Sequence, residues 1–137
     1  MSDNLKTAMA ISATGMRAQG FRLKIVAQNI ANVSTTADRT GGDPYRRKIV
    51  TFENVLNREL NAKTVGIQKV HKDPSDFRLK YDPTHPAADE QGMVQLPNVN
   101  ALVETIDMRE AQRSYEANLS MIEASKNLVS RTIGLLR

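Results

Sequence analysis

The chain offers few side chains that could ligate a metal or act as a nucleophile. It has no cysteine, which rules out disulfides, thiolate zinc sites and cysteine nucleophiles. Its only two histidines, His71 and His85, lie fourteen residues apart, outside the HxxxH or HxH spacing that would bring two imidazoles onto one ion. We therefore expect no metal site and interpret His85 as a surface loop residue.

Two carboxylates come closest to an acid–base arrangement. Asp107 and Glu110 would lie on neighbouring turns of a predicted helix, with Arg109 and Arg113 among them. That mixture favours surface ion pairs over general acid–base catalysis. No nucleophile elbow, phosphate-binding loop or dinucleotide fingerprint occurs along the chain. The sequence therefore predicts no catalytic residues, no cofactor and no enzyme, and a small hydrolase is disfavoured.

The charge is mildly basic, with a formal net charge of +4 from 19 Lys plus Arg and 15 Asp plus Glu. The densest cluster, Arg46-Arg47-Lys48 beside Tyr45, is typical of a solvated strand edge. Nucleic-acid-binding proteins more often concentrate basic residues on one face, and residues 97–137 carry equal numbers of acidic and basic side chains. A basic helical nucleic-acid-binding protein is nevertheless an alternative at this point.

The first segment, residues 1–34, has the pattern of a helix that packs along a seam. Apolar side chains recur at alternating spacings of four and three, beginning with Leu5 and Met9, and this period of 3.5 is a heptad signature. Gly15 and Gly20 would each cost about 1 kcal/mol relative to alanine in a helix. The helix is therefore weak alone, but its small residues allow neighbours to approach closely.

The last segment, residues 97–137, repeats the same rhythm. Pro97-Asn98 is a plausible helix start. Eleven positions from Ala101 to Leu136 follow the alternating spacing, and eight of them are apolar or aromatic. A helix of this length cannot be wrapped by the remainder of so short a chain.

The middle segment, residues 35–96, has loop and strand patterns. Thr40–Pro44 is loop chemistry, and short strands are expected at 45–52, 65–71, 77–81 and 92–96, with a short helix at 53–62. We therefore predict a mainly α fold, an elongated antiparallel hairpin of two coiled-coil-like helices with a small β-rich insert. The predicted parts are the N-terminal helix at 1–34, the loop and insert at 35–96 and the C-terminal helix at 97–137.

The sequence gives no sign of a membrane anchor. No window approaches the ~18–20 consecutive apolar residues that a membrane helix needs. The N-terminus lacks the basic stretch and apolar core of a secretory signal peptide. We expect a chain that is not embedded in a membrane and is exported, if at all, without a cleavable signal.

Four motifs stand out along the chain: Asn29-Ile30-Ala31-Asn32, Gly41–Lys48, Leu96-Pro97-Asn98-Val99-Asn100 and Tyr115-Glu116-Ala117-Asn118. Together they closely resemble the FlgC family of bacterial flagellar basal-body rod proteins, and the resemblance covers nearly the whole chain. One departure is the loop from Val33 to Pro44, which is longer than the short turn that many flagellar axial proteins have at this point.

The resemblance implies a structural subunit of the proximal rod. Such subunits polymerise into a helical tube that encloses the export channel and transmits torque from motor to hook. The implied partners are copies of the chain, other proximal and distal rod proteins, the rod-base adaptor of the export gate and, during secretion, the flagellar type III export apparatus. The rod would span the periplasm. Another axial subunit is the nearest alternative, and the Gly-Gly-Asp-Pro-Tyr and Leu-Pro-Asn-Val-Asn stretches argue against it.

The resemblance and the heptad pattern together predict the residues that contact other subunits. Tyr45, Arg46 and Arg47 are expected to make loop contacts. The expected subunit-packing residues are Leu5, Met9, Met16, Leu23, Val26, Asn29, Ile30, Asn32, Met108, Tyr115, Asn118, Leu119, Ile122, Val129, Ile133 and Leu136.

Overall fold

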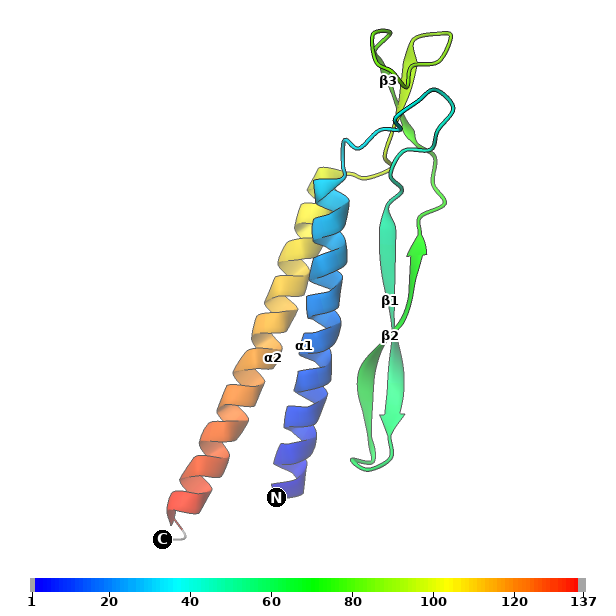
Figure 1. Ribbon diagram of the computed structural model, residues 1–137. Coiled ribbons are helices and arrows are strands. Elements are labelled where there is room, and N and C mark those ends of the chain that lie inside the picture. Colours follow the sequence, from blue (N-terminus) through cyan, green and yellow to red (C-terminus); the bar gives the residue numbers. More distant parts are fainter. Residues whose placement is uncertain (1, 136–137) are drawn as a thin grey trace. The chain divides into compact units, whose positions relative to one another are not determined.

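The computed structural model describes residues 2–135 and combines two long helices with four strands (Figure 1). Helices hold 48% of the residues and strands 22%. The fold is therefore mixed α and β, and the predicted mainly α fold with a small insert is wrong. The elements are α1 (Ser2–Ala31), β1 (Lys48–Asn57), β2 (Ala62–Lys72), β3 (Arg78–Tyr81), β4 (Met93–Leu96) and α2 (Ala101–Leu135).

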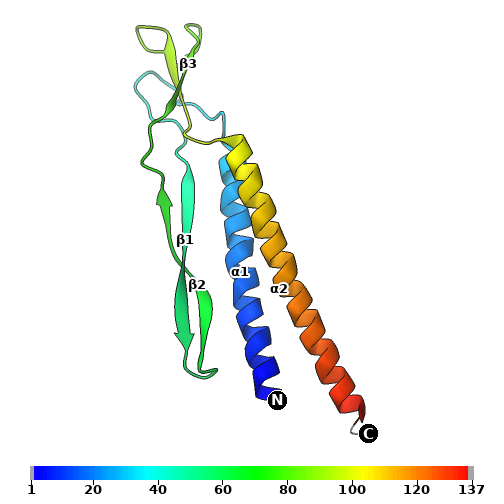
Figure 2. The same cartoon turned by 180° about the vertical axis from the view of Figure 1, so that it is seen from behind.

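The error lies mainly in the segment after Phe52, where a short helix was expected. Strand β1 instead continues to Asn57 and pairs with β2 as a two-stranded sheet (Figure 2). The turn forms because the Asn57 side chain accepts hydrogen bonds from the backbone N–H groups of Glu59 at 3.0 Å and Leu60 at 3.3 Å. Asn61 then adopts φ +44°, a left-handed conformation that asparagine tolerates better than most residues.

The chain folds into two compact units, each of which draws on both helices. Unit 1 comprises Met1–Leu23, Thr51–Lys69 and Arg109–Arg137, and unit 2 comprises Lys24–Val50 and Val70–Met108.

In unit 1 the two helices meet through small side chains. A Cβ on Gly15 would lie 3.0 Å from Asn118, and one on Gly20 would lie 3.9 Å from Tyr115, so the helices run antiparallel here. Ala18 and Ala111 are buried beside this contact, at 2% and 0% exposed. Because small residues fill the contact, the helix backbones approach closely and the larger apolar side chains lie elsewhere.

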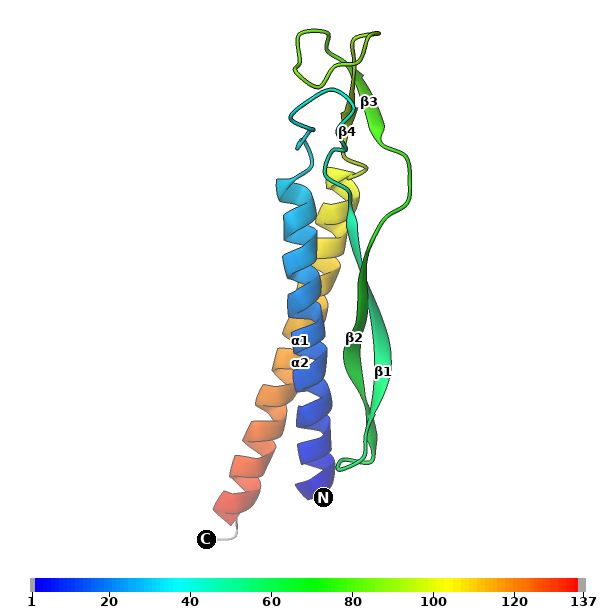
Figure 3. The same cartoon turned by 45° about the vertical axis from the view of Figure 1, so that its right-hand side comes forward.

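Unit 2 contains the second two-stranded sheet, in which β3 pairs antiparallel with β4 (Figure 3). Val94 in β4 and Val99 just before α2 are almost completely buried. Gly92 sits in the connecting turn at φ +76°, and a Cβ there would lie 2.9 Å from the Tyr81 ring. Strand pairing aligns Arg78 with Leu96, Leu79 with Gln95, Lys80 with Val94 and Tyr81 with Met93.

The helices within residues 2–135 are too polar to cross a membrane.

Candidate functional site

A buried polar cluster in unit 2 centres on Glu104, in the first turn of α2. Asn100 starts this helix, because its side-chain oxygen accepts a hydrogen bond from the Leu102 N–H at 3.0 Å. Glu104 is 0% exposed. Its two oxygens accept hydrogen bonds from Asn29 Nδ2 at 3.0 Å and Arg47 Nε at 2.5 Å. A buried carboxylate is stable only when it is paired in this way.

Asn29, near the end of α1, connects Glu104 to the start of β1. Its Nδ2 donates to the Lys48 carbonyl at 2.8 Å, and its Oδ1 accepts from the Lys48 N–H at 3.0 Å. The same Oδ1 accepts from the Tyr45 hydroxyl at 2.9 Å. With the bond to Glu104, the amide uses both donors and both lone pairs. Asparagine suits this position because a carboxylate has no donor to offer.

Arg47 is surrounded by three carboxylates. Besides Glu104, its guanidinium lies 3.4 Å from Asp73 and 3.7 Å from Asp107. Burial lowers the pKa of Arg47, but the hydrogen bond and charge of Glu104, followed by those of Asp73, outweigh it, so the net change raises this pKa. Burial, and secondarily the charge of Glu104, raises the pKa of the Tyr45 hydroxyl. Arg47 therefore stays charged and Tyr45 stays protonated.

A second layer of bonds fixes the backbone around this centre. Asn98 Oδ1 accepts from the Arg47 N–H at 2.8 Å, and Asn98 Nδ2 donates to the Asp73 carbonyl at 3.1 Å. Arg46 Nη1 donates to the Asp73 and Ser75 carbonyls, and the guanidinium lies 4.1 Å from the centre of the Phe77 ring. Hydrogen bonds from the Ser75 N–H and side chain, with a smaller effect of Arg47, lower the pKa of Asp73.

The structure thus brings together the three residues that were expected to make loop contacts. Tyr45, Arg46 and Arg47 all bond within unit 2. Sequence reasoning missed Glu104 and Asp73 as their partners. In the sequence, Glu104 is only an acidic residue near the start of a predicted helix. Such residues usually lie at the surface, where they interact favourably with the helix dipole.

The expected subunit-packing residues are divided between the interior and the surface. On α1, Val26 and Asn29 are buried, and Leu5, Met9, Met16, Leu23 and Ile30 are half-buried, as is Asn32 just beyond the helix. On α2, Met108, Tyr115, Asn118 and Ile122 are half-buried, whereas Leu119, Val129 and Ile133 are exposed. Leu136 lies outside the described residues.

On α2, the side chains covered within the subunit include a column that lies outside the predicted pattern. Thr105, Gln112, Leu119 and Lys126 belong to that pattern and are exposed. The column that is covered is Glu104, Ala111, Asn118 and Ser125, with Ser125 4% exposed. The pattern of large apolar residues does not predict this covered column, because the residues in it are small or polar.

Large apolar side chains remain exposed along α2. In unit 2, Leu102 is 69% and Ile106 57% exposed. In unit 1, Leu128 is 53% and Ile133 55% exposed. The full exposed set on this helix is Leu102, Val103, Ile106, Leu119, Met121, Leu128, Val129, Ile133 and Leu135.

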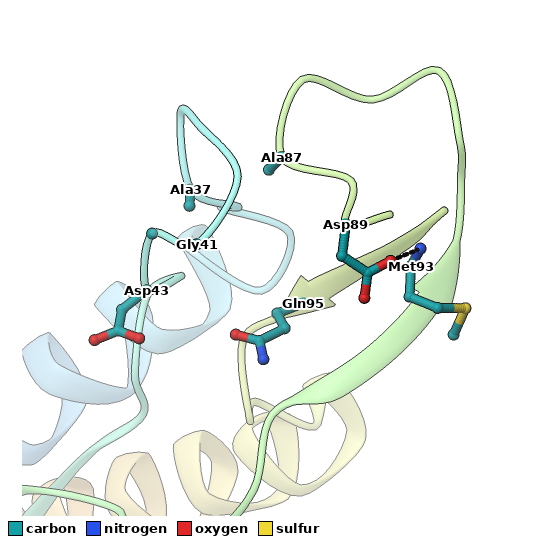
Figure 4. A pocket seen from close by; sticks show the side chains of 8 residues that line it. Ala37, Gly41, Asp43, Ala87, Asp89, Met93 and Gln95 are labelled. Atoms are coloured by element: carbon teal, nitrogen blue, oxygen red, sulfur yellow. Dashed lines mark hydrogen bonds between the residues drawn. The ribbon is translucent and has the colours of Figure 1, made fainter. Parts of the chain in front are cut away.

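A hollow of about 270 Å³ lies between the loops of unit 2 (Figure 4). Asp43, Asp89 and Gln95 line it, and Asp89 Oδ1 accepts from the Met93 N–H at 2.8 Å. Nearby, the Ala87 N–H donates to His85 Nδ1 at 3.0 Å, and His85 Nε2 lies 3.3 Å from the Thr36 hydroxyl. No group of three or more metal-ligating side chains occurs within residues 2–135.

Comparison with known proteins gives a single answer. Residues 90–135 match the family described as flagellar basal body rod FlgEFG protein C-terminal. The chain is 49% identical over 135 residues to the flagellar basal-body rod protein FlgC of Agrobacterium fabrum, covering 98% of this chain and 97% of that protein. The chain belongs to the FlgC family. Two further FlgC proteins are similar over most of their length: that of Aquifex aeolicus, 41% identical with 91% and 92% covered, and that of Bacillus subtilis, 37% identical with 92% and 94% covered.

Membership of the FlgC family confirms the resemblance seen in the motifs. The chain is a structural subunit of the flagellar basal-body rod and assembles with other rod components. It also decides against the alternative of a different axial subunit.

Proposed function

We propose that this FlgC-family chain forms part of the proximal rod, as a helical tube that transmits torque from motor to hook and encloses the export channel. The observation that carries this proposal is the exposed apolar surface of α2. Soluble monomers rarely expose large contiguous apolar patches without a functional reason. Here nine large apolar side chains on one helix are 37–87% exposed.

The composition of the helix contact in unit 1 explains why this surface is left over. The buried helix residues in unit 1 are Ser12, Gly15, Ala18, Ala111 and Ser125. Burial within the subunit therefore covers few large apolar side chains. If neighbours buried about 1,000 Å² of apolar area, the gross stabilisation would be about 25 kcal/mol, before the entropy of association. Burial of this size would help to hold a stiff polymer together without a covalent link.

The polar cluster has an indirect part in this proposal. Tyr45, Arg46 and Arg47 would hold the loop before β1 against Asn29 and Glu104, so that unit 2 resists deformation under torque. A buried, fully bonded network suits this role because it specifies one arrangement of its members. These three residues would then position subunit contacts rather than make all of them.

The remaining expectations belong to the same proposal. The neighbours would be other copies, the other proximal and distal rod proteins and the rod-base adaptor of the export gate. The chain would reach the periplasm through the flagellar type III export apparatus. None of these steps needs a metal, a cofactor or catalysis.

Substitution of one exposed apolar residue tests the proposal. A strain lacking its own copy of the gene would carry Leu128→Asp, with Asn127→Asp, an exposed polar position on the same turn, as the control. We expect Leu128→Asp to abolish swimming in soft agar and to remove the chain from isolated basal bodies. Asn127→Asp should swim normally. Normal swimming of the Leu128→Asp strain would contradict the proposed use of this surface.

A further inference from the structure

A small groove lies between α1 and β2 in unit 1. It has a volume of about 190 Å³ and is lined by Thr14, Arg17, Ala18, Val65 and Ile67. Its two walls are joined where the Val65 N–H donates to Thr14 Oγ1 at 3.4 Å. Ala18 is buried and Ile67 is 39% exposed. The groove therefore presents an apolar lining that is open to a side chain from outside.

Basic residues surround this apolar lining. Arg17 is one of the lining residues and is exposed. Side chains alternate along a strand, so Lys63 and Lys69 share the face of β2 that carries Val65 and Ile67. Lys63 and Lys69 are exposed, and within residues 2–135 none of the three cations forms an ion pair. The groove thus combines an apolar floor with three uncompensated positive charges.

Another surface of unit 1 has the complementary pattern. Leu119 on α2 is 38% exposed and does not line the groove. Glu116 and Glu123 lie three residues before it and four residues after it, the spacings that place side chains next to each other on a helix. Both glutamates are exposed, and neither has an ion-pair partner in the described part of the chain.

We propose that Leu119 of one copy inserts into the groove of a second copy, with Glu116 and Glu123 facing Arg17, Lys63 and Lys69. This inference rests on the proposed polymerisation and names one contact within it. We choose a second copy as the partner because the charges are complementary. Leu119 lies between two glutamates, and the apolar groove lies among three basic residues. The surface around Leu119 and the groove are different surfaces of the chain. The contact therefore repeats head to tail and builds a ring or a helical filament.

Disulfide trapping tests the contact directly, because the chain contains no cysteine of its own. A chain carrying Leu119→Cys and Ile67→Cys would be expressed in cells, and basal bodies would be isolated and oxidised. We expect dimers and higher multiples of the chain. Each single substitution, and Leu128→Cys combined with Ile67→Cys, should remain monomeric. A rod that contains the 67–119 pair only as monomer, or linked to a protein of another mass, would overturn the proposal.

Charge reversal gives an independent test that does not alter the apolar groove. Arg17→Glu alone, or Glu116→Lys with Glu123→Lys, should reduce swimming by about two-fold or more, since like charges then face each other. Reversal of both surfaces in one chain, with Lys63→Glu and Lys69→Glu added to these three changes, should restore most of the loss. Unchanged swimming in the first two strains, or no recovery in the third, would overturn the contact. Absence of the unmodified chain from the rod would instead overturn the proposed function itself.

Discussion

Asn29 on α1 donates a hydrogen bond at 3.0 Å to Glu104 on α2, a carboxylate with no exposed surface that lies 75 residues further along the chain. The same asparagine binds both backbone groups of Lys48. One amide therefore links the end of one helix, the beginning of the other and the first residue of β1.

Removing the buried carboxylate should destabilise unit 2. Glu104→Ala should lower the free energy of unfolding by about 3 kcal/mol, because Arg47 loses its closest anion. Arg47 keeps the more distant carboxylates of Asp73 and Asp107. Glu104→Gln keeps an acceptor for Asn29 and should lose less. Urea denaturation followed by tyrosine fluorescence measures the difference, since the chain has no tryptophan. Equal stability of the alanine variant and the parent would show that the cluster contributes little.

The amide of Asn29 should be more important than that of its motif neighbour Asn32. Asn29→Asp should cost more than Asn29→Ala, because a new carboxylate would face Glu104 and would lack the donor for Lys48. Asn32→Ala removes a local bond to the Gln28 carbonyl and should cost only about 1 kcal/mol. Amide exchange of Lys48 reports the loss of its acceptor in the Asn29→Ala variant, and slow exchange there would contradict the bonding described here.

Two glycines in the helices should respond in opposite ways to a side chain. A Cβ at Gly15 would lie 3.0 Å from Asn118, whereas none of the described atoms lies within 4 Å of one at Gly134. Gly15→Leu should therefore separate α1 from α2 in unit 1 and abolish motility. Gly134→Ala should leave the helix packing intact and favour the helical conformation in the last turn of α2. Circular dichroism and a swimming assay distinguish the two, and a motile Gly15→Leu strain would argue against close helix packing.

Asp73 should make unit 2 sensitive to acid. Its pKa is lowered in the folded state, first by the Ser75 hydrogen bonds and then by Arg47. Its contribution is therefore complete above the pKa of an unfolded aspartate, about 3.9, and is lost as the pH falls through the lower folded value. Asp73→Asn should be less stable at pH 7 and should lose less stability between pH 5 and pH 2. Parallel pH profiles of the two proteins, measured as urea midpoints, would exclude this role.

The two long helices could be predicted from local pattern. Heptad spacing, the start signal at Pro97-Asn98 and the mixture of turn residues between 35 and 96 are properties of neighbouring residues, so short windows contain them. The extension of β1 to Asn57 could not be read in this way. Its turn depends on side-chain bonds from Asn57 and on the left-handed backbone of Asn61, and Glu53–Ala62 has an equally acceptable helical pattern.

The sequence by itself determined the heptad rhythm, the lack of thiols and the motifs of the FlgC family. Only the tertiary structure decided which column of α2 lies inside and which residues surround Arg47. Glu104, Ala111, Asn118 and Ser125 are too polar or too small to stand out in a hydrophobic pattern. Their burial arises because Gly15 and Ala18 let the helices of unit 1 approach closely, and because Asn29 and Arg47 compensate the charge of Glu104 in unit 2.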